Sequence, residues 1–398
     1  MDAGSAPIQP STDEADAGAL LADLVAIDTQ NPPGKEAECA QFIHETLTEW
    51  GIDSRLIDEP FADRPQVIAT IGNGEPDAGT LVLNGHIDVV PPGDPTKWTD
   101  DPFSGTIRDG RVYGRGASDM KSGVAAAMLT AKAVADADRT LAGELVLTFA
   151  VGEETAEPGT KRLLEEPQVA GADYGIVLEP TELVVDTAGK GLAWYTLTVD
   201  GESCHASRPH LGKNALGAIL SLDGPIAEYQ DRIADRTHDL LGTSLCTPTM
   251  AAAGEKENVV PDHAELRFDR RFLPSVDIDA LDAEMDDLAA SLREDGFAVT
   301  VERTRTYEAA EIPTDAAIAS VLREHAAAVA GVETDPHGKE AATDQRNFVN
   351  DAGIPAIIWG PGTPAQSHTV DEWARTDLLA QSVTILCRSL EPLCGVTG

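Results

Sequence analysis

The chain has 398 residues, of which 42% are apolar and 5% aromatic, and this length allows two domains or three small ones. No apolar run approaches the roughly 18 residues that a membrane helix requires, so a membrane-spanning protein is excluded. The chain carries 68 acidic and 29 basic residues, a net charge of −39. Such a surface repels nucleic acid and anionic lipid, so we expect neither as a partner.

The acidic residues are spread along the chain instead of forming one tail, which indicates a folded protein with an acidic surface. This surface resembles those of proteins from salt-loving organisms. The five cysteines contain no C-x-x-C pair, so they indicate neither a disulfide framework nor a cysteine zinc site. The first residues do not form a secretory signal. We therefore expect a cytoplasmic location.

Two helices open the chain, one around residues 20–27 and one that ends at Gly51, with an Asn-Pro-Pro-Gly turn between them. Short β-rich runs then alternate with helical segments. The runs are QVIATI, TLVLNGHIDVV, ELVLTFAV and YGIVLEP, and an Ala-rich helix at about 121–135 follows the second. This alternation is typical of an α/β layer with a mostly parallel sheet and helices on both faces.

The stretch from 188 to 303 has a different order of predicted strands and helices. Its segments follow the order strand, helix, strand, strand, helix, strand, which predicts a small α+β domain of βαββαβ order. The tail returns to the α/β pattern, with the buried strand IPAIIWG and a helix at about 376–390. We therefore predict one α/β domain made of residues 1–187 and 304–398, interrupted by an inserted domain of residues 188–303.

Several strands of the α/β part lead into side chains that can bind metal ions. These side chains, together with one in the turn before the Ala-rich helix, are His86, Asp88, Asp119, Glu153, Glu154, Glu179 and His368. Ligand sites of open α/β sheets lie at the carboxyl ends of the strands, so these residues can converge. Two histidines with several carboxylates and no thiolate suit Zn²⁺, and less specifically Mn²⁺ or Co²⁺. One carboxylate can bridge two ions roughly 3.5 to 4 Å apart.

Each of these residues also has an ordinary structural explanation. Taken alone, His86 and Asp88 are more often a satisfied polar pair than metal ligands. Glu153 and Glu154 would usually form a solvated turn, and His368 would be a surface histidine. The order and setting of all of them together favour the metal site.

The sequence resembles one family over most of its length. The matching blocks occur in family order and are LVAIDTQNPPG, LVLNGHIDVVPPGDPTKWTDDPFSGTIRDGRVYGRGASDMKSGVAA, VGEE, LEPT, HASRPHLGKNA, NVVPDHAELRFDRR, ATDQRNF and GPGTPAQSHTVDEW. They resemble the zinc metallohydrolase family of acetylornithine deacetylase, succinyl-diaminopimelate desuccinylase, aminoacylase and glutamate carboxypeptidase. The resemblance implies a zinc-exopeptidase-like catalytic domain, and it makes the inserted domain a lid or dimerisation domain.

The resemblance also implies two zinc ions per subunit. It makes His86 and Glu179 ligands of one ion, Glu154 and His368 ligands of the other, and Asp119 the carboxylate that bridges both. The family often has a cis peptide after the bridging residue, which here is the bond to Met120.

Three further roles follow from the same resemblance. Asp88 would fix the tautomer of His86. Glu153 would be the general base, which takes a proton from water and returns it to the leaving amine. His205 of the inserted domain would reach across a homodimer to stabilise the oxyanion, although a surface histidine that closes a strand is the ordinary explanation. His210 is more easily explained as structural.

Asn258, Arg271 and Arg346 are candidates for binding a substrate carboxylate, since an arginine fork matches a carboxylate in two places. Pairing with a surface acid explains Arg346 nearly as well. Gly362 can bring backbone close to the same pocket, and a plain turn explains it equally. The family's Ser/Thr-Asp-Ala/Gly-Arg pattern is Thr-Asp-Gln-Arg here, at residues 343–346, which leaves substrate choice most open.

We therefore predict a hydrolase of the amide bond in an N-acyl amino acid, of the acetylornithine deacetylase or succinyl-diaminopimelate desuccinylase type, in arginine or lysine biosynthesis. A metallo-carboxypeptidase of the same family is the first alternative. Family dipeptidases and tripeptidases tend to carry aspartate where this chain has Glu179. The second alternative is a binding protein that keeps the fold without catalysis, but such a protein is expected to have lost a ligand or the base, and all of these residues are present.

Overall fold

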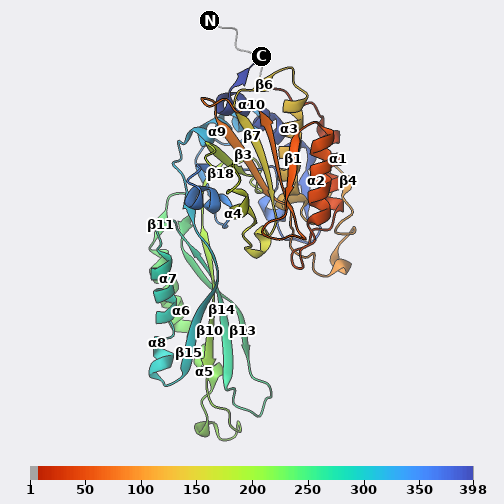
Figure 1. Cartoon of the computed structure of the whole chain (residues 1–398). Coiled ribbons are helices and arrows are strands. Elements are labelled where there is room, and N and C mark those ends of the chain that lie inside the picture. Colours follow the sequence, from red (N-terminus) through yellow and green to blue (C-terminus); the bar gives the residue numbers. More distant parts are fainter. Residues whose placement is uncertain (1–7, 398) are drawn as a thin grey trace. The chain divides into compact units, whose positions relative to one another are not determined.

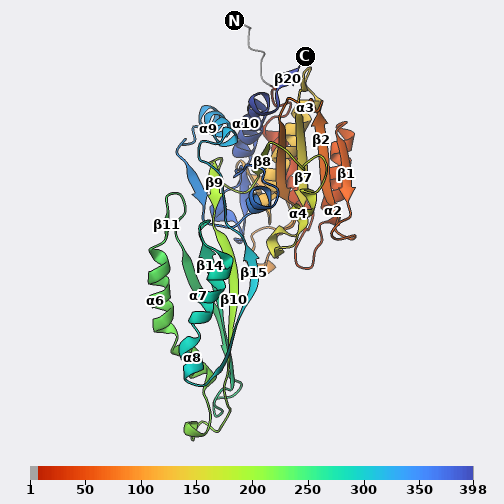
Figure 2. The same ribbon diagram turned by 60° about the vertical axis from the view of Figure 1, so that its left-hand side comes forward.

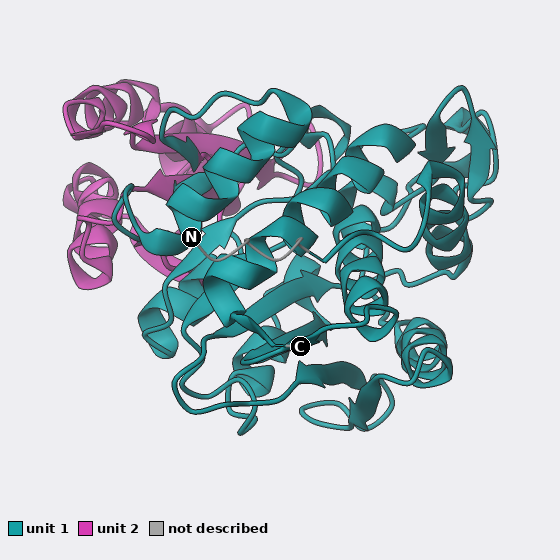
Figure 3. Cartoon of the chain, turned by 90° about the horizontal axis from the view of Figure 1, so that it is seen from above, with its two compact units in different colours: residues 1–188, 311–338, 343–398 teal, residues 189–310, 339–342 magenta. Residues whose placement is uncertain are grey.

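The structure is a computed structural model that describes residues 8–397 (Figure 1). The chain forms two compact units (Figure 3). Unit 1 comprises Met1–Ala188, Glu311–Gly338 and Thr343–Gly398, and unit 2 comprises Gly189–Ala310 and Lys339–Ala342. The inserted segment therefore extends past residue 303, because its last strand runs to Tyr307.

A nine-stranded sheet forms the centre of unit 1, in the order β1-β2-β7-β3-β8-β18-β9-β16, with β17 beside β9. Its strands are β1 (Asp53–Ile57), β2 (Gln66–Gly72), β3 (Thr80–His86), β7 (Glu144–Ala150), β8 (Tyr174–Val177), β9 (Asp186–Gly189), β16 (Ala310–Glu311), β17 (His337–Lys339) and β18 (Ala356–Ile358). The pairs β7–β3, β3–β8 and β8–β18 are parallel, whereas β1–β2, β2–β7 and β9–β18 are antiparallel. The predicted α/β class is confirmed.

Helices cover both faces of this sheet, as the buried runs of its central strands predict. They are α1 (Glu14–Ala26), α2 (Ala37–Glu49), α3 (Ser122–Ala135), α4 (Gly159–Leu163), α9 (Ala317–Ala330) and α10 (Thr376–Cys394). Neighbouring residues of β3 enter different apolar clusters. Leu81 and Leu83 pack into the cluster that contains α1, α3 and α10, whereas Val82 packs on the other side with Leu163 of α4.

Short strands outside the main sheet complete unit 1. The strands β4 (Thr106–Arg108), β5 (Arg111–Tyr113) and β19 (Trp373–Arg375) form a three-stranded sheet, and β6 (Thr140–Leu141) pairs with β20 (Val396–Thr397). None of the helices within residues 8–397 is both long enough and apolar enough to cross a membrane.

Unit 2 has the predicted βαββαβ order around an antiparallel sheet, β13-β14-β10-β15, with helices along one face (Figure 2). Its main strands are β10 (Gly191–Asp200), β13 (Leu245–Ala253), β14 (His263–Phe272) and β15 (Ala298–Tyr307), and a small hairpin joins β11 (Thr237–His238) to β12 (Gly242–Thr243). Each predicted helix is broken in two, giving α5 (Ala215–Leu220), α6 (Asp223–Ala234), α7 (Ile278–Asp287) and α8 (Ala290–Glu294).

The start of α3 lies so close to the end of β8 that only glycine fits there. A Cβ on Gly123 would lie 2.2 Å from the carbonyl oxygen of Leu178, so Gly123→Ala must push the helix away from the sheet. We expect this overpacking to cost about 1–3 kcal/mol. Gly224 of α6 has no atom within 4 Å of the same position, and there we expect alanine to stabilise by about 0.4–1 kcal/mol. Urea denaturation measures both variants, and equal midpoints would show that the close approach does not matter.

Candidate metal centre

Three neighbouring parallel strands deliver the first candidate ligands to one edge of the sheet. His86 is the last residue of β3, and Glu179 follows the end of β8 by two residues. On the other side of β3, β7 ends at Ala150 and the chain turns into η3 (Glu153–Thr155), which carries Glu154. Because β7, β3 and β8 are parallel, their carboxyl ends meet at this edge.

Two loops supply the remaining candidates. Asp119 lies in the turn η2 (Ala117–Lys121) that leads into α3, and its peptide bond to Met120 is cis, as the family resemblance implies. His368 lies beyond the short helix η6 (Pro364–Gln366), with a left-handed backbone (φ +62°) that a residue other than glycine seldom adopts.

The candidate ligand atoms form two groups that share Asp119. In the first, His86 Nε2 lies 3.4 Å from Asp119 Oδ1 and 3.9 Å from Glu179 Oε1. In the second, His368 Nε2 lies 3.2 Å from Glu154 Oε2 and 3.6 Å from Asp119 Oδ2. Within each group all ligand atoms lie within 4.8 Å of one another. The two oxygens of Asp119 therefore face different histidines.

These separations fit a metal ion between the ligands. Two atoms that each bind zinc at about 2.1 Å, at tetrahedral angles, lie about 3.4 Å from each other. The distances from His86 and His368 to their nearest carboxylates lie close to this value. One imidazole with two carboxylates in each group is also a donor set that zinc, manganese and cobalt accept.

The electrostatics of the centre favour cations. Burial opposes protonation of His86, yet Asp119 and the charges of Asp88, Glu153 and Glu179 raise its pKa well above its usual value. For His368, the hydrogen bond to Glu154, against the opposing effect of burial, and the charges of Glu154 and Asp119 raise the pKa to about 9. Two histidines that hold protons this strongly indicate an excess of negative charge, which divalent ions would neutralise.

Asp88 organises the turn that carries both glutamates. Its carboxylate accepts hydrogen bonds from the backbone N–H groups of Gly152, Glu153 and Glu154, at 2.9, 3.2 and 3.1 Å. His86 Nδ1 lies 2.9 Å from the backbone carbonyl of Asp88 but 3.7 Å from its carboxylate. The expected contact with the His86 ring thus comes from the backbone of Asp88, while its side chain binds the turn.

A chain of buried and partly buried polar groups binds Asp88, and sequence analysis missed it. Asn31 Nδ2 donates to Asp88 Oδ2 at 3.1 Å and to Glu157 Oε2 at 3.1 Å. Arg64 joins Glu157 to the fully buried Glu36, with distances of 2.8 and 2.6 Å from Nη2. Asn31 belongs to the Asn-Pro-Pro-Gly segment, whose sequence predicted a turn but did not indicate these contacts.

Glu153 lies beside the ligand groups without belonging to either of them. Its side chain is partly buried. Burial, together with the charges of Asp344, Glu179 and Glu154, raises its pKa well above the usual range, and the charge of His86 opposes this. A carboxylate with a raised pKa next to a site for cations can accept a proton and return it.

Arg346 and Gly362 belong to unit 1, and both have structural partners. Arg346 donates to the carbonyl of Thr343 at 2.6 Å and lies 3.5 Å from Asp344 Oδ1, so the pairing with an acid is the observed arrangement. A Cβ on Gly362 would lie 2.3 Å from the carbonyl oxygen of Ser118. Glycine is therefore needed where this loop packs against the turn that carries Asp119.

Gln345, where the family pattern has a small residue, is fully buried. Its Nε2 donates to the carbonyl of Ala356 in β18 at 2.8 Å and to that of Thr187 in β9 at 3.3 Å. These two strands pair through a single register position, so the amide ties them together. The departure from the family pattern thus has a structural explanation.

Unit 2 brings His205 and Asn258 together. The N–H of Ala206 donates to the carbonyl of Asn258 at 2.9 Å, and both candidate side chains are exposed. The N–H of Ser207 donates to His205 Nδ1 at 3.1 Å. Because this nitrogen is an acceptor, neutral His205 carries its proton on Nε2. His205 can therefore donate a hydrogen bond from Nε2.

Arg271 lies at the opposite end of the same sheet. The pairing Asp200↔His263 marks one end of β14, and Leu192↔Arg271 lies next to the other end, eight residues away and hence roughly 27 Å along the strand. Arg271 binds Asp269 with Nε and Nη2, at 2.8 and 3.1 Å. His205 and Asn258 lie in the loops beyond the end marked by Asp200 and His263. Unit 2 of one chain therefore does not bring Arg271 together with them.

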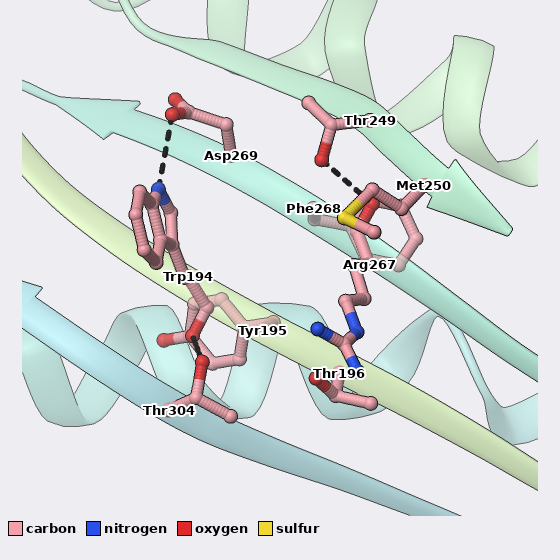
Figure 4. A pocket seen from close by; sticks show the side chains of 9 residues that line it. All are labelled: Trp194, Tyr195, Thr196, Thr249, Met250, Arg267, Phe268, Asp269 and Thr304. Atoms are coloured by element: carbon pink, nitrogen blue, oxygen red, sulfur yellow. Dashed lines mark hydrogen bonds between the residues drawn. The ribbon is translucent and has the colours of Figure 1, made fainter. Parts of the chain in front are cut away.

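A hollow of about 440 Å³ lies on the sheet of unit 2 (Figure 4). Trp194 Nε1 donates to Asp269 at 3.1 Å at one side, and Met250 and Arg267 lie opposite. The predicted site residues are not among the residues that line it.

Comparisons with known proteins show the family of the chain. The profile of peptidase family M20/M25/M40 matches residues 82–391. A succinyl-diaminopimelate desuccinylase of Xanthomonas oryzae pv. oryzae (strain MAFF 311018) is 33% identical over 382 residues, 93% of this chain and 96% of the relative. A probable succinyl-diaminopimelate desuccinylase of Staphylococcus aureus (strain N315) is 27% identical over 396 residues, 92% of this chain and 94% of the relative.

Solved structures share the fold. A tripeptidase from Staphylococcus aureus covers 95% of this chain and 98% of its own, with a TM-score of 0.77 and 20% identity. An M20 family metallo-carboxypeptidase from Sulfolobus solfataricus covers 96% of this chain and 99% of its own, also with a TM-score of 0.77 and 20% identity. At these identities the likeness concerns the fold alone.

Two groups of one histidine and two carboxylates that share a carboxylate are the kind of donor set found in two-metal hydrolases. The chain belongs to peptidase family M20/M25/M40 and is a hydrolase that acts on amide bonds.

The adjacent glutamates Glu153 and Glu154 form a matched pair for a test of metal binding. Glu154→Gln removes a carboxylate from the second group, and we expect the purified variant to bind one zinc ion fewer than the wild type. Glu153→Gln changes a neighbour outside both groups and is expected to keep the wild-type zinc content. Atomic absorption after dialysis measures the zinc content of both variants. Identical zinc contents would refute the assignment of Glu154, but not Glu153, as a ligand.

Proposed function

We propose that the protein is a dinuclear zinc-dependent amidohydrolase that removes the acyl group from an N-acyl amino acid, releasing a carboxylic acid and the free amino acid. The single observation that supports this most strongly is that Asp119 faces both histidines while Glu153 lies next to the two groups. The named activity of the 33% identical relative supports succinyl-diaminopimelate as the substrate class, with N-acetylornithine as the related alternative.

In this proposal His86, Asp119 and Glu179 would hold one ion, and Asp119, Glu154 and His368 would hold the other. Zinc supplies Lewis acidity, which lowers the pKa of water and polarises an amide carbonyl; Co²⁺ or Mn²⁺ can supply the same chemistry. Glu153 takes the proton of the attacking water and delivers it to the nitrogen of the amide as the C–N bond breaks. Its position beside the ligands, without being one of them, supports this role.

His205 completes the proposal as the donor to the oxyanion. Its tautomer supports this role, since Nε2–H is the nitrogen left to donate. The resemblance implies that this histidine would act in the active site of the partner in a homodimer. The roughly 27 Å between the two ends of β14 supports such an arrangement, because Arg271 and the pair His205 and Asn258 would then serve different sites.

The substrate carboxylate would bind to Asn258, Arg271 and Arg346, with Gly362 shaping the loop nearby. Arg271 and Arg346 are already paired with Asp269 and Asp344, so the substrate would compete with these acids or share their arginine. The cysteines are free, which supports a reducing compartment such as the cytoplasm for the proposed enzyme.

A panel of substrates tests the reaction. The zinc-loaded protein, assayed in high salt, is expected to release amine from N-succinyl-diaminopimelate or N-acetylornithine in preference to other acyl amino acids and dipeptides. A chelator should abolish the activity and zinc should restore it. Hydrolysis of dipeptides alone would make the protein an exopeptidase, the carboxypeptidase being the main alternative. Silence across the panel with zinc bound would favour a non-catalytic role.

Mixing two inactive variants tests the shared active site. Glu153→Gln and His205→Ala are each expected to be nearly inactive. If His205 serves the partner's site, a mixed dimer contains one intact site, and random exchange of subunits restores about one quarter of the wild-type rate. Each variant subjected alone to the same exchange is the control. A mixture no more active than its components would place both residues in the same subunit's site.

A further inference from the structure

One buried carboxylate binds the turn that presents Asp119. Glu372 Oε1 accepts hydrogen bonds from the N–H groups of Ser118 and Asp119, at 2.9 and 3.0 Å. Its Oε2 accepts from the N–H of Gly116 at 3.0 Å and from Arg115 Nη1 at 2.6 Å. The residue is completely buried, so four donors satisfy both oxygens of a charge that water does not reach.

This arrangement needs a carboxylate specifically. The turn η2 is irregular, and the N–H groups of Ser118, of Asp119 and of Gly116, which precedes η2, all point to Glu372. An amide side chain has a single acceptor oxygen, so it can accept only some of these four hydrogen bonds. Its NH₂ group, itself a donor, would face the remaining donors. Arg115, itself buried, pairs with Glu372 and offsets the cost of burying the charge.

The same contacts join two segments that each carry a candidate ligand. The N–H of Gly114 donates to the carbonyl of Glu372 at 2.9 Å. The hydroxyl of Ser118 donates to the carbonyl of Thr363 at 2.9 Å and accepts from its N–H at 2.8 Å. The segment 362–372, which carries His368, is therefore fastened to the segment 114–119 at both ends.

We propose that Glu372 is a positioning residue that fixes Asp119, the carboxylate shared by both metal groups, before any ion binds. It acts through the backbone of Asp119 and touches neither ion nor substrate. Without ions, Glu154 and Glu179 repel Asp119, and the bond from Glu372 to its N–H resists that displacement. This inference rests on the proposed two-metal function, because it assigns Glu372 a role only if Asp119 binds both ions.

The variant Glu372→Gln tests the inference through zinc affinity. Competition with a chromogenic chelator is expected to show affinity for both ions reduced by about 10- to 100-fold, as is usual when a group that orients a metal ligand is lost. Glu166→Gln is the matched control, since Glu166 is also buried and binds two arginines, Arg55 and Arg162, but has no contact with η2. The control should keep the wild-type affinities.

Hydrogen exchange of the metal-free wild-type protein provides a test that does not depend on a variant. Mass spectrometry of a peptide covering residues 115–120 should show slow exchange at Gly116, Ser118 and Asp119, because Glu372 holds these N–H groups without metal. Exchange as fast as in an exposed loop would overturn the inference.

The outcomes separate this inference from the proposed function. A wild-type protein that binds no zinc overturns both. A wild-type protein that binds two ions, with unchanged affinities in a folded Glu372→Gln variant, overturns the positioning role alone. Reduced affinity in Glu372→Gln together with unchanged affinity in Glu166→Gln supports it, and circular dichroism checks that both variants are folded.

Discussion

Mutual repulsion among carboxylates is the constraint around which unit 1 is built. Asp119, Glu154 and Glu179 converge on two histidines at one edge of the sheet, where burial strengthens the repulsion between charges. Two further buried carboxylates, Asp88 and Glu372, each accept hydrogen bonds from three backbone N–H groups of the turns that carry Glu154 and Asp119. These two buried carboxylates bind the turns that carry Asp119 and Glu154, two of the candidate acidic ligands.

This arrangement divides the work between strands and turns. Parallel strands bring His86 and Glu179 to the same edge and leave little freedom in their spacing. Asp119, Glu154 and His368 lie on irregular segments, which need side chains to satisfy their backbone groups. Asn31, Arg64 and the acids they bind extend this support away from the centre. The polar network therefore fixes the positions of the loop residues, as strand pairing fixes those of the strand residues.

The sequence predicted the convergence but not the support. His86 ends an apolar strand and Glu154 and Glu179 lie a few residues beyond the ends of two others, and the geometry of parallel sheets places such residues together. No sequence pattern indicated the contacts of Glu372, because hydrogen bonds to irregular turns do not recur at a fixed spacing along the sequence. The family resemblance gave Asp88 the role of fixing the tautomer of His86, yet its carboxylate binds the turn 152–154, which only the folded chain brings near.

In unit 2 the order of strands and helices could be predicted from the sequence, whereas the placement of single residues could not. Strand register decides that His205 and Asn258 share one end of the sheet while Arg271 lies at the other. The sequence pattern likewise did not indicate the breaks within the two predicted helices or the extension of β15 to Tyr307.

Diffraction from crystals of the zinc-loaded protein, recorded on both sides of the zinc absorption edge, tests the two-ion centre most directly. Two anomalous peaks per chain are expected, one contacting His86 and Glu179 and the other contacting Glu154 and His368, with Asp119 between them. A single peak, or peaks away from Asp119, would contradict a centre in which this residue is shared.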